Sequence, residues 1–182
     1  MLSFEEVQDP SHHRGTRADS GASLLECPRL MVIHDLTASQ CRELLGRTHL
    51  GRLACAKADQ PYITPIFFYY DAGQDSLFSF STLGQKVEWM RGNPKVCVEV
   101  DEIIGQQNWR TVLVFGRYEE IDDSAAGRVL RTMIQSKLEG QPGWWLPGAA
   151  KLAGGPEHHV AVLYRVRVDR LSGRHAARPV GT

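Results

Sequence analysis

The chain has 182 residues, 42% of them hydrophobic, which is enough for one domain with a sizeable core. Its 21 lysines and arginines balance its 21 aspartates and glutamates. A chain of zero net charge has no overall field to attract nucleic acid or an acidic membrane surface, so we expect neither as a partner.

The cysteines and the N-terminus indicate a cytoplasmic protein without a metal site. The four cysteines lie far apart, without the short paired spacings of a zinc knuckle or a disulfide framework, and are Cys27, Cys41, Cys55 and Cys97. The first residues have neither a basic start nor the apolar segment of a signal peptide. No run approaches the ~20 apolar residues that a membrane span requires.

The chain is expected to divide into a flexible arm over residues 1–30, one domain over 31–174 and a tail over 175–182. The first 26 residues are polar and lack periodicity. His12 and His13 lie in this arm, but no further ligands are spaced to complete a metal site with them.

The first regular element is a short helix. Thr37 and Gln40 form a capping box, and the helix is expected to end near Gly46. Strands follow over residues 52–58, 62–70 and 77–81. Pro65 has no N–H group, so its position must be a sheet edge, a bulge or a site facing a ligand. The apolar stripe of the helix consists of Cys41, Leu44 and Leu45.

The turn at residues 81–86, between a strand and a short helix, is the first candidate site. It holds Ser81, Thr82, Gly84, Gln85 and Lys86. Unpaired N–H groups at a helix start favour an anion, and Ser81 or Thr82 is expected to cap the helix. A lysine in the first turn opposes the helix dipole, which a bound phosphate would explain. The alternative is an ordinary capped helix with a solvated lysine.

The second half of the chain predicts long strands and one more helix. The helix after the turn is expected to bury Leu83, Val87 and Met90 and to end at Asn93. Residues 95–101 and 109–120 alternate as half-buried antiparallel strands, and residues 159–171 form the last strand. Asp123 or Ser124 is expected to cap a helix whose apolar face consists of Ala126, Val129, Leu130, Met133, Ile134 and Leu138.

A Gly- and Pro-rich loop over residues 140–159 separates that helix from the last strand. Trp144 and Trp145 are expected to form either a flap over a ligand or a plug between subunits. His158 and His159 are interpreted as loop residues rather than metal or haem ligands. Arg165 and Arg167 are expected to meet acidic residues across strands, with Glu99 or Asp101 as the partners.

These elements predict a mainly β protein with short helices, a small six-stranded antiparallel barrel of Greek-key type. The segments GRLACA, YITPIFFYY, LFSFSTLGQKVEWMRGNPKVCVEVDEI, WRTVLVFGRYEEI and YRVRVDRLSGR occur in one order. Together they resemble the FMN-binding split barrels of the pyridoxamine 5'-phosphate oxidase-like family. The resemblance is nearest to the small flavin-binding branch related to 5-nitroimidazole resistance proteins, and it covers roughly residues 36–174.

The resemblance implies FMN bound at the interface of a homodimer. In such a site, Thr64, Pro65, Ile66 and Phe67 would pass the edge of the isoalloxazine ring. Ser81, Thr82, Gln85 and Lys86 would hold the phosphate. Trp109, Arg110 and Thr111 would reach the cofactor, and Arg110 would replace a charge that is missing because Gln85 stands where the family often has arginine.

Three functions follow from these observations. The first is an FMN-dependent oxidoreductase that passes hydride or electrons to a small acceptor, with a nicotinamide cofactor as a possible donor. The sequence shows no nucleophile–base constellation, so no catalytic side chain is assigned. The second is a flavin-binding store or sensor without turnover. The third is a split barrel that binds haem or a deazaflavin.

Overall fold

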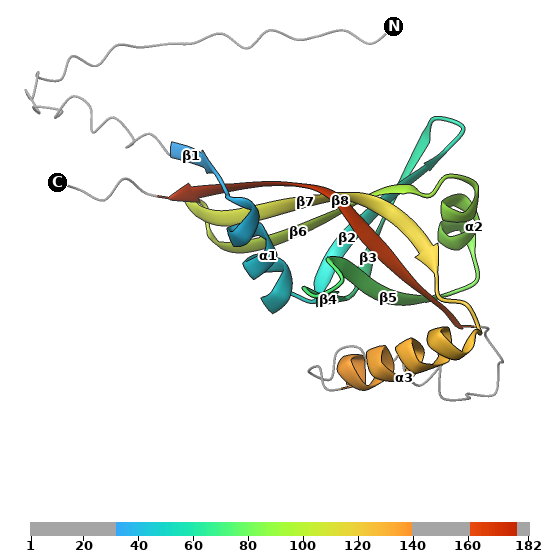
Figure 1. Cartoon of the computed structure of the whole chain (residues 1–182). Coiled ribbons are helices and arrows are strands. Elements are labelled where there is room, and N and C mark those ends of the chain that lie inside the picture. The colour runs from blue at the N-terminus through green and yellow to red at the C-terminus, as the bar shows by residue number, and fades with distance from the viewer. Residues whose placement is uncertain (1–31, 140–160, 178–182) are drawn as a thin grey trace, which may run out of the picture.

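The computed structural model describes residues 32–139 and 161–177, which form eight strands and three helices (Figure 1). The strands are β1 (Val32–Asp35), β2 (Leu50–Lys57), β3 (Gln60–Phe67), β4 (Tyr69–Asp71), β5 (Ser76–Thr82), β6 (Lys95–Gly105), β7 (Asn108–Glu120) and β8 (Ala161–Ala177). The helices are α1 (Ala38–Arg47), α2 (Gln85–Gly92) and α3 (Ala125–Glu139). The arm, the tryptophans Trp144 and Trp145, the histidines His12, His13, His158 and His159, and residues 178–182 lie outside the described residues.

All strand pairs are antiparallel, and the sheet order is β3-β2-β6-β7-β8-β5-β4, with β1 paired to β8. This confirms the mainly β fold with short helices. Eight strands replace the predicted six for two reasons. β1 was not expected, and the predicted strand over residues 62–70 breaks at Phe68, which is fully buried. Before the break β3 pairs with β2, and after it β4 pairs with β5, so the chain turns a corner of the barrel there.

The barrel core forms from the alternating positions that the sequence indicated. Val98, Val100, Val112 and Val114 are 0% exposed, as the period-two pattern of β6 and β7 predicts. β8 continues to Ala177, beyond the predicted domain end at residue 174, because β1 and β7 pair with its last residues.

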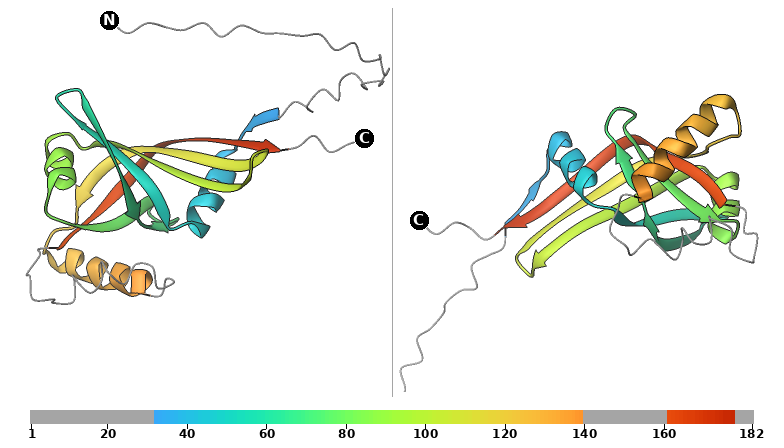
Figure 2. Two further views of the ribbon diagram at one scale, coloured as in Figure 1. Left: turned by 180° about the vertical axis from the view of Figure 1, so that it is seen from behind. Right: turned by 90° about the horizontal axis from the view of Figure 1, so that it is seen from below.

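The helices lie at three different places around the sheet (Figures 1 and 2). α1 has the predicted capping box, with the Thr37 N–H donating to Gln40 Oε1 at 2.8 Å. Its predicted stripe of Cys41, Leu44 and Leu45 is buried. α2 lies at the opposite end of the sheet from the tip of the β6–β7 hairpin, while α3 packs against the β5–β8 side.

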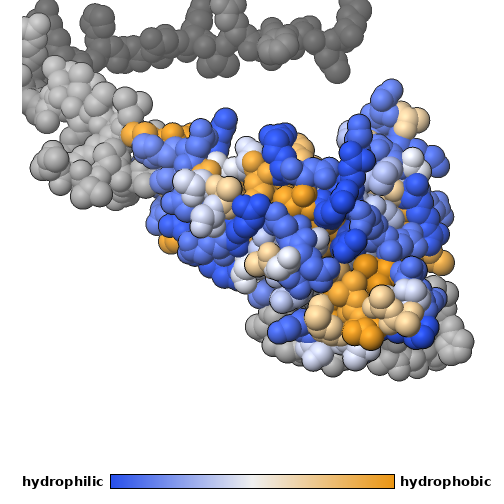
Figure 3. All heavy atoms as spheres, in the orientation of Figure 1, coloured by the Kyte–Doolittle hydropathy of each residue, from blue (hydrophilic) through white to orange (hydrophobic). Residues whose placement is uncertain are grey.

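α3 buries less of its apolar face than the sequence pattern predicts. Ser124 caps it, because its hydroxyl accepts a hydrogen bond from the Gly127 N–H at 3.1 Å. Ile134 is fully buried and Leu130 half-buried, but Val129 remains 72% exposed. Ala126 and Met133 are also exposed, and apolar atoms are visible on this helix in Figure 3. α3 packs on the barrel through Ile134 and Leu130, so the barrel covers only this part of its apolar face.

Cross-strand ion pairs form as expected, but with other partners. Arg165 pairs with Glu119 at 2.7 Å, and Arg167 approaches the same carboxylate at 3.5 Å. Glu99 and Asp101 instead bind Arg52, at 3.1 and 3.0 Å. The predicted partners were wrong because β8 lies beside β7 and β5, not beside β6.

Candidate functional site

The 81–86 turn joins β5 to α2 with no side-chain cap. β5 ends at Thr82, the helix begins at Gln85, and Gly84 occupies the N-cap position with an extended backbone. The Ser81 hydroxyl donates to the Thr82 carbonyl at 2.9 Å instead of capping the helix, so the predicted cap was wrong. Leu83 precedes the helix and is 50% exposed, so it does not join Val87 and Met90 in the core.

The start of α2 therefore presents unsatisfied donors. The first helical hydrogen bond at this end runs from the Glu88 N–H to the Gly84 carbonyl at 3.1 Å. The N–H groups of Gln85, Lys86 and Val87 precede that bond and find no acceptor in the described part of the chain. Such a cluster of N–H groups attracts anions.

Lys86 is half-buried, and no carboxylate among the described residues pairs with it. Burial lowers the pKa of its amine, and the nearby Cys55 thiol, when ionised, partly opposes this effect. Cys55 is itself a core residue, 4% exposed, and burial raises its pKa. A buried ammonium without a partner is costly, and a bound anion would remove that cost.

The predicted flavin-edge segment, Thr64 to Phe67, lies on β3, which is an edge strand of the sheet. Pro65 thus stands at an edge, one of the three positions predicted for it. Ile66 is 4% exposed and belongs to the core, whereas Thr64, Pro65 and Phe67 are more open. The start of β3 adjoins α2, because the Tyr62 ring packs edge-on against Trp89 at 5.7 Å. The Thr64–Phe67 segment therefore lies on a strand that packs against α2, the helix that follows the 81–86 turn.

The third predicted segment, Trp109 to Thr111, lies at the other end of the molecule. Lys86 interacts with Cys55, and the neighbouring Ala54 pairs with Cys97 of β6. Trp109 of β7 pairs with Ile103, which lies on β6 as Cys97 does. Six residues of extended strand separate Cys97 from Ile103, about 20 Å at 3.3 Å per residue. One chain thus does not bring this segment to the 81–86 turn (Figure 1).

Strand alternation also divides this segment between two faces of the sheet. Thr111 pairs with Asp101 on the outer face, and its hydroxyl donates to Glu99 at 3.3 Å. Arg110 points to the other face, where it pairs with Glu102 of β6 and His175 of β8. Trp109 shares the outer face with Thr111.

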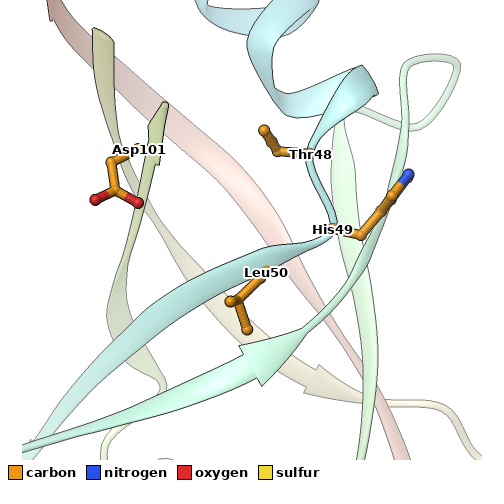
Figure 4. Close-up of a pocket in the computed structure, with 4 residues that line it drawn as sticks. All are labelled: Thr48, His49, Leu50 and Asp101. Carbon is orange, nitrogen blue, oxygen red and sulfur yellow. The ribbon is translucent and has the colours of Figure 1, made fainter. Parts of the chain in front are cut away.

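A hollow of about 360 Å³ opens between the α1–β2 connection and β6, and sequence reasoning missed it. Its lining residues are Thr48, His49, Leu50 and Asp101, and Asp101 lies across from the α1–β2 connection (Figure 4). Leu50 pairs with Phe67 on one side, and Asp101 pairs with Thr111 on the other. Only the strand register places these residues together, so no spacing in the sequence could have indicated the hollow.

The described residues contain no group of three or more His, Cys, Asp or Glu side chains that could hold a metal ion. None of the three described helices has the length and the hydropathy of a membrane-spanning segment.

A family model, a protein sequence and solved structures match this chain over most of its length. The model of the pyridoxamine 5'-phosphate oxidase family matches residues 37–175. An uncharacterized protein of Rhizobium meliloti (strain 1021) is 34% identical over 151 residues, which is 80% of this chain and 97% of that protein. The crystal structure of an FAD-binding protein from Mesorhizobium loti is 37% identical, has a TM-score of 0.68, and is matched over 81% of this chain and 98% of that one. An FAD-binding protein from Mycobacterium smegmatis has a TM-score of 0.55 at 20% identity, over 79% and 98% of the two chains, which shows a shared fold.

Proposed function

The chain belongs to the pyridoxamine 5'-phosphate oxidase family, and we propose on that premise that it binds FMN and transfers hydride or electrons to a small acceptor. The similar proteins from Mesorhizobium loti and Mycobacterium smegmatis are described as FAD-binding, which supports a flavin as the cofactor class. A reduced nicotinamide is the proposed electron donor. Flavin chemistry supplies the hydride or electron transfer, and the protein supplies position and polarity.

The observation that carries the proposal is the half-buried amine of Lys86 at the start of α2, which pairs with no carboxylate in the described ranges 32–139 and 161–177. With the first N–H groups of the helix, it offers one positive charge and several donors to one phosphate. Thr82 lies at the end of β5 and adds a hydroxyl at the same turn, whereas the Ser81 hydroxyl donates to the Thr82 carbonyl and would have to turn away from it to bind a phosphate. The residues present thus fit the terminal phosphate of a flavin mononucleotide.

We propose FMN rather than FAD because the turn offers one lysine and one helix start, which suit a single phosphate. Gln85, the preceding residue, is exposed and neutral, so it adds hydrogen bonding but no charge. The exposed edge of β3, with Thr64 and Pro65, is the proposed contact for the flavin ring.

We also propose that the working unit is a homodimer. Leu50, Ile63 and Ile103 are 48%, 64% and 71% exposed, and strand alternation places them on the outer face of the sheet. In the described part of the chain, no helix covers this face (Figure 2). Large apolar side chains on an open face favour pairing with a second copy, and a two-fold axis would bring Trp109 and Thr111 of that copy toward the flavin.

The absorption spectrum and the released cofactor of the purified protein test the function. Flavin bands, FMN in the heat-released fraction, and oxidation of a reduced nicotinamide on addition of an acceptor are expected. FAD in the released fraction would replace FMN as the cofactor, and a Soret band would indicate haem instead of flavin. Flavin without turnover would indicate a store or sensor. A stable monomer in light scattering at micromolar concentration would contradict the dimer.

A further inference from the structure

A row of basic side chains crosses three strands at the end of the sheet far from Lys86. His34 of β1 pairs with His175 of β8, and His175 pairs on its other side with Arg110 of β7. Directly paired residues of an antiparallel sheet project on the same side, so the three side chains form one continuous row. The two imidazole rings stack with centroids 5.2 Å apart and planes 26° from parallel.

The Arg110 guanidinium of this row meets no carboxylate among the described residues. Arg110 and His34 are exposed, and His175 is half-buried. The nearest acid in the row, Glu102, pairs with Arg110 in the sheet, but its carboxylate binds Arg47 of α1 at 2.7 Å. The structure records no carboxylate contact for the Arg110 guanidinium in its described part, which leaves a planar fork of N–H groups exposed.

The acids near the row are already engaged elsewhere. Glu43 of α1 binds Arg47 at 3.1 Å, so α1 brings no free carboxylate. Asp35 of β1 faces Arg174 across the strands on the opposite side of the sheet, at 3.6 Å. In formal charge, Arg110 and Arg47 balance Glu43 and Glu102, so the row offers a ligand exposed N–H donors rather than an excess of positive charge.

We infer that His34, His175 and Arg110 form a binding site for the phosphate or diphosphate group of a small molecule. A guanidinium fork matches phosphate oxygens in pairs, and each imidazole adds one N–H donor at neutral pH. Three adjacent strands span about 10 Å at 4.8 Å spacing, a width that a diphosphate can bridge. A divalent cation would need the same imidazoles but would be repelled by Arg110.

This site is separate from the proposed flavin site. Strand alternation turns Arg110 away from Trp109 and Thr111, and Lys86 lies about 17 Å along the sheet at 3.3 Å per residue. A flavin bound at the 81–86 turn of the same chain therefore leaves the row free. The two sites can be tested one at a time.

Inorganic pyrophosphate is the probe, added to the full-length protein while the ring nitrogens of its histidines are followed by NMR. Signals that disappear in His34→Gln and His175→Gln identify the two rings. Both should shift saturably with pyrophosphate and stay unchanged with sodium chloride at equal ionic strength. Arg110→Gln should weaken pyrophosphate binding at least about tenfold, because a charge-assisted contact is lost.

Two control variants separate the sites. Arg174 lies next to His175 on β8 but projects from the opposite face of the sheet. Arg174→Gln should therefore leave pyrophosphate binding at the row unchanged. Lys86→Ala should also leave it unchanged, so failure of the flavin proposal would not affect this result. Pyrophosphate affinity that is equal in Arg110→Gln and wild type would overturn the inference. So would ring shifts that zinc ions produce and pyrophosphate does not.

Discussion

The two ends of α2 carry cations in opposite situations. Near its C-terminal end, Arg91 makes two bonds to Glu120, at 2.6 and 3.0 Å, and the Tyr118 hydroxyl donates to the same carboxylate at 2.7 Å. At its N-terminal end, Lys86 is half-buried and has no carboxylate partner in the described residues. The hydrogen bond to Glu120 raises the pKa of Arg91, whereas burial lowers the pKa of Lys86.

This difference separates a cation that holds the fold together from one that is available to a ligand. The Arg91–Glu120–Tyr118 network connects α2 to the end of β7, and every member has a partner. A second network of the same kind joins α1 to the β4–β5 turn through Arg42, Asp75 and Tyr70. Lys86 differs from the members of these networks because it is half-buried without a carboxylate partner among the described residues, and such a cation is a candidate for ligand binding.

The largest expected effect is on flavin affinity. Lys86→Ala should weaken FMN binding about 10- to 150-fold, because a charge-assisted contact contributes roughly 1.5–3 kcal/mol. Riboflavin, which lacks the phosphate, should bind wild type and variant almost equally. Fluorescence titration of the flavin-free protein measures both affinities. Equal FMN affinity in the two proteins would end the phosphate assignment and remove the contrast between the two ends of α2.

A second prediction concerns alkaline pH. Because the folded-state pKa of Lys86 lies below the ordinary 10.5, its charge is lost earlier than that of an exposed lysine as pH rises. FMN affinity should then fall by up to about tenfold per pH unit above that pKa. Titrations from pH 7 to pH 10 measure the slope. Lys86→Arg, which stays charged throughout, should remove it, and a wild-type profile as flat as that of Lys86→Arg would contradict the prediction.

Stability should respond at the other end of the helix. Arg91→Met should lower the free energy of unfolding measurably, because a two-bond pair is lost and Glu120 keeps only Tyr118. Arg117→Met is the matched control, since both arginine side chains are 48% exposed but Arg117 makes a single contact of 3.2 Å with Asp169. Urea unfolding should show almost no change for the control. A similar loss in both variants would mean that the network adds nothing beyond a surface ion pair.

Acid should weaken the same network in wild type. Arg91 lowers the pKa of Glu120 below the ordinary 4.5, so this contribution is present above pH 4.5 and is lost as pH falls through the folded-state pKa. The loss of stability on acidification should therefore be smaller in Arg91→Met than in wild type. Urea unfolding at pH 7 and at pH 3.5 provides the comparison.

The smallest expected effect has the opposite sign. Lys86→Met keeps the length of the side chain but removes the buried charge, so the flavin-free protein should be slightly more stable, by about 1–3 °C in its melting temperature. Thermal unfolding of the flavin-free proteins at pH 7 measures the shift. A clear destabilisation would show that Lys86 contributes to the fold, as Arg91 does.

Prediction from the sequence was most accurate for strands and helices that have one face in the core and the other in water. The alternation of β6 and β7 gave the buried valines correctly, and Thr37 with Gln40 gave the start of α1. Prediction failed where packing against another element decides whether a side chain is buried. Val129 has the spacing of a core residue, yet it is exposed because α3 meets the barrel along a narrow line. Leu83 was misplaced because α2 begins two residues later than its apolar spacing indicated.

The family, the antiparallel β class and the 81–86 turn with Lys86 could be predicted from the amino-acid order, because they depend on residues that are close along the chain. Three other features required the three-dimensional structure: Arg110 lies beside His175 and far from Lys86, Arg165 meets Glu119, and Leu50 and Asp101 line a hollow. These are consequences of strand order and register. A strand pattern shows which face a residue takes, but pairing between distant segments sets its neighbours.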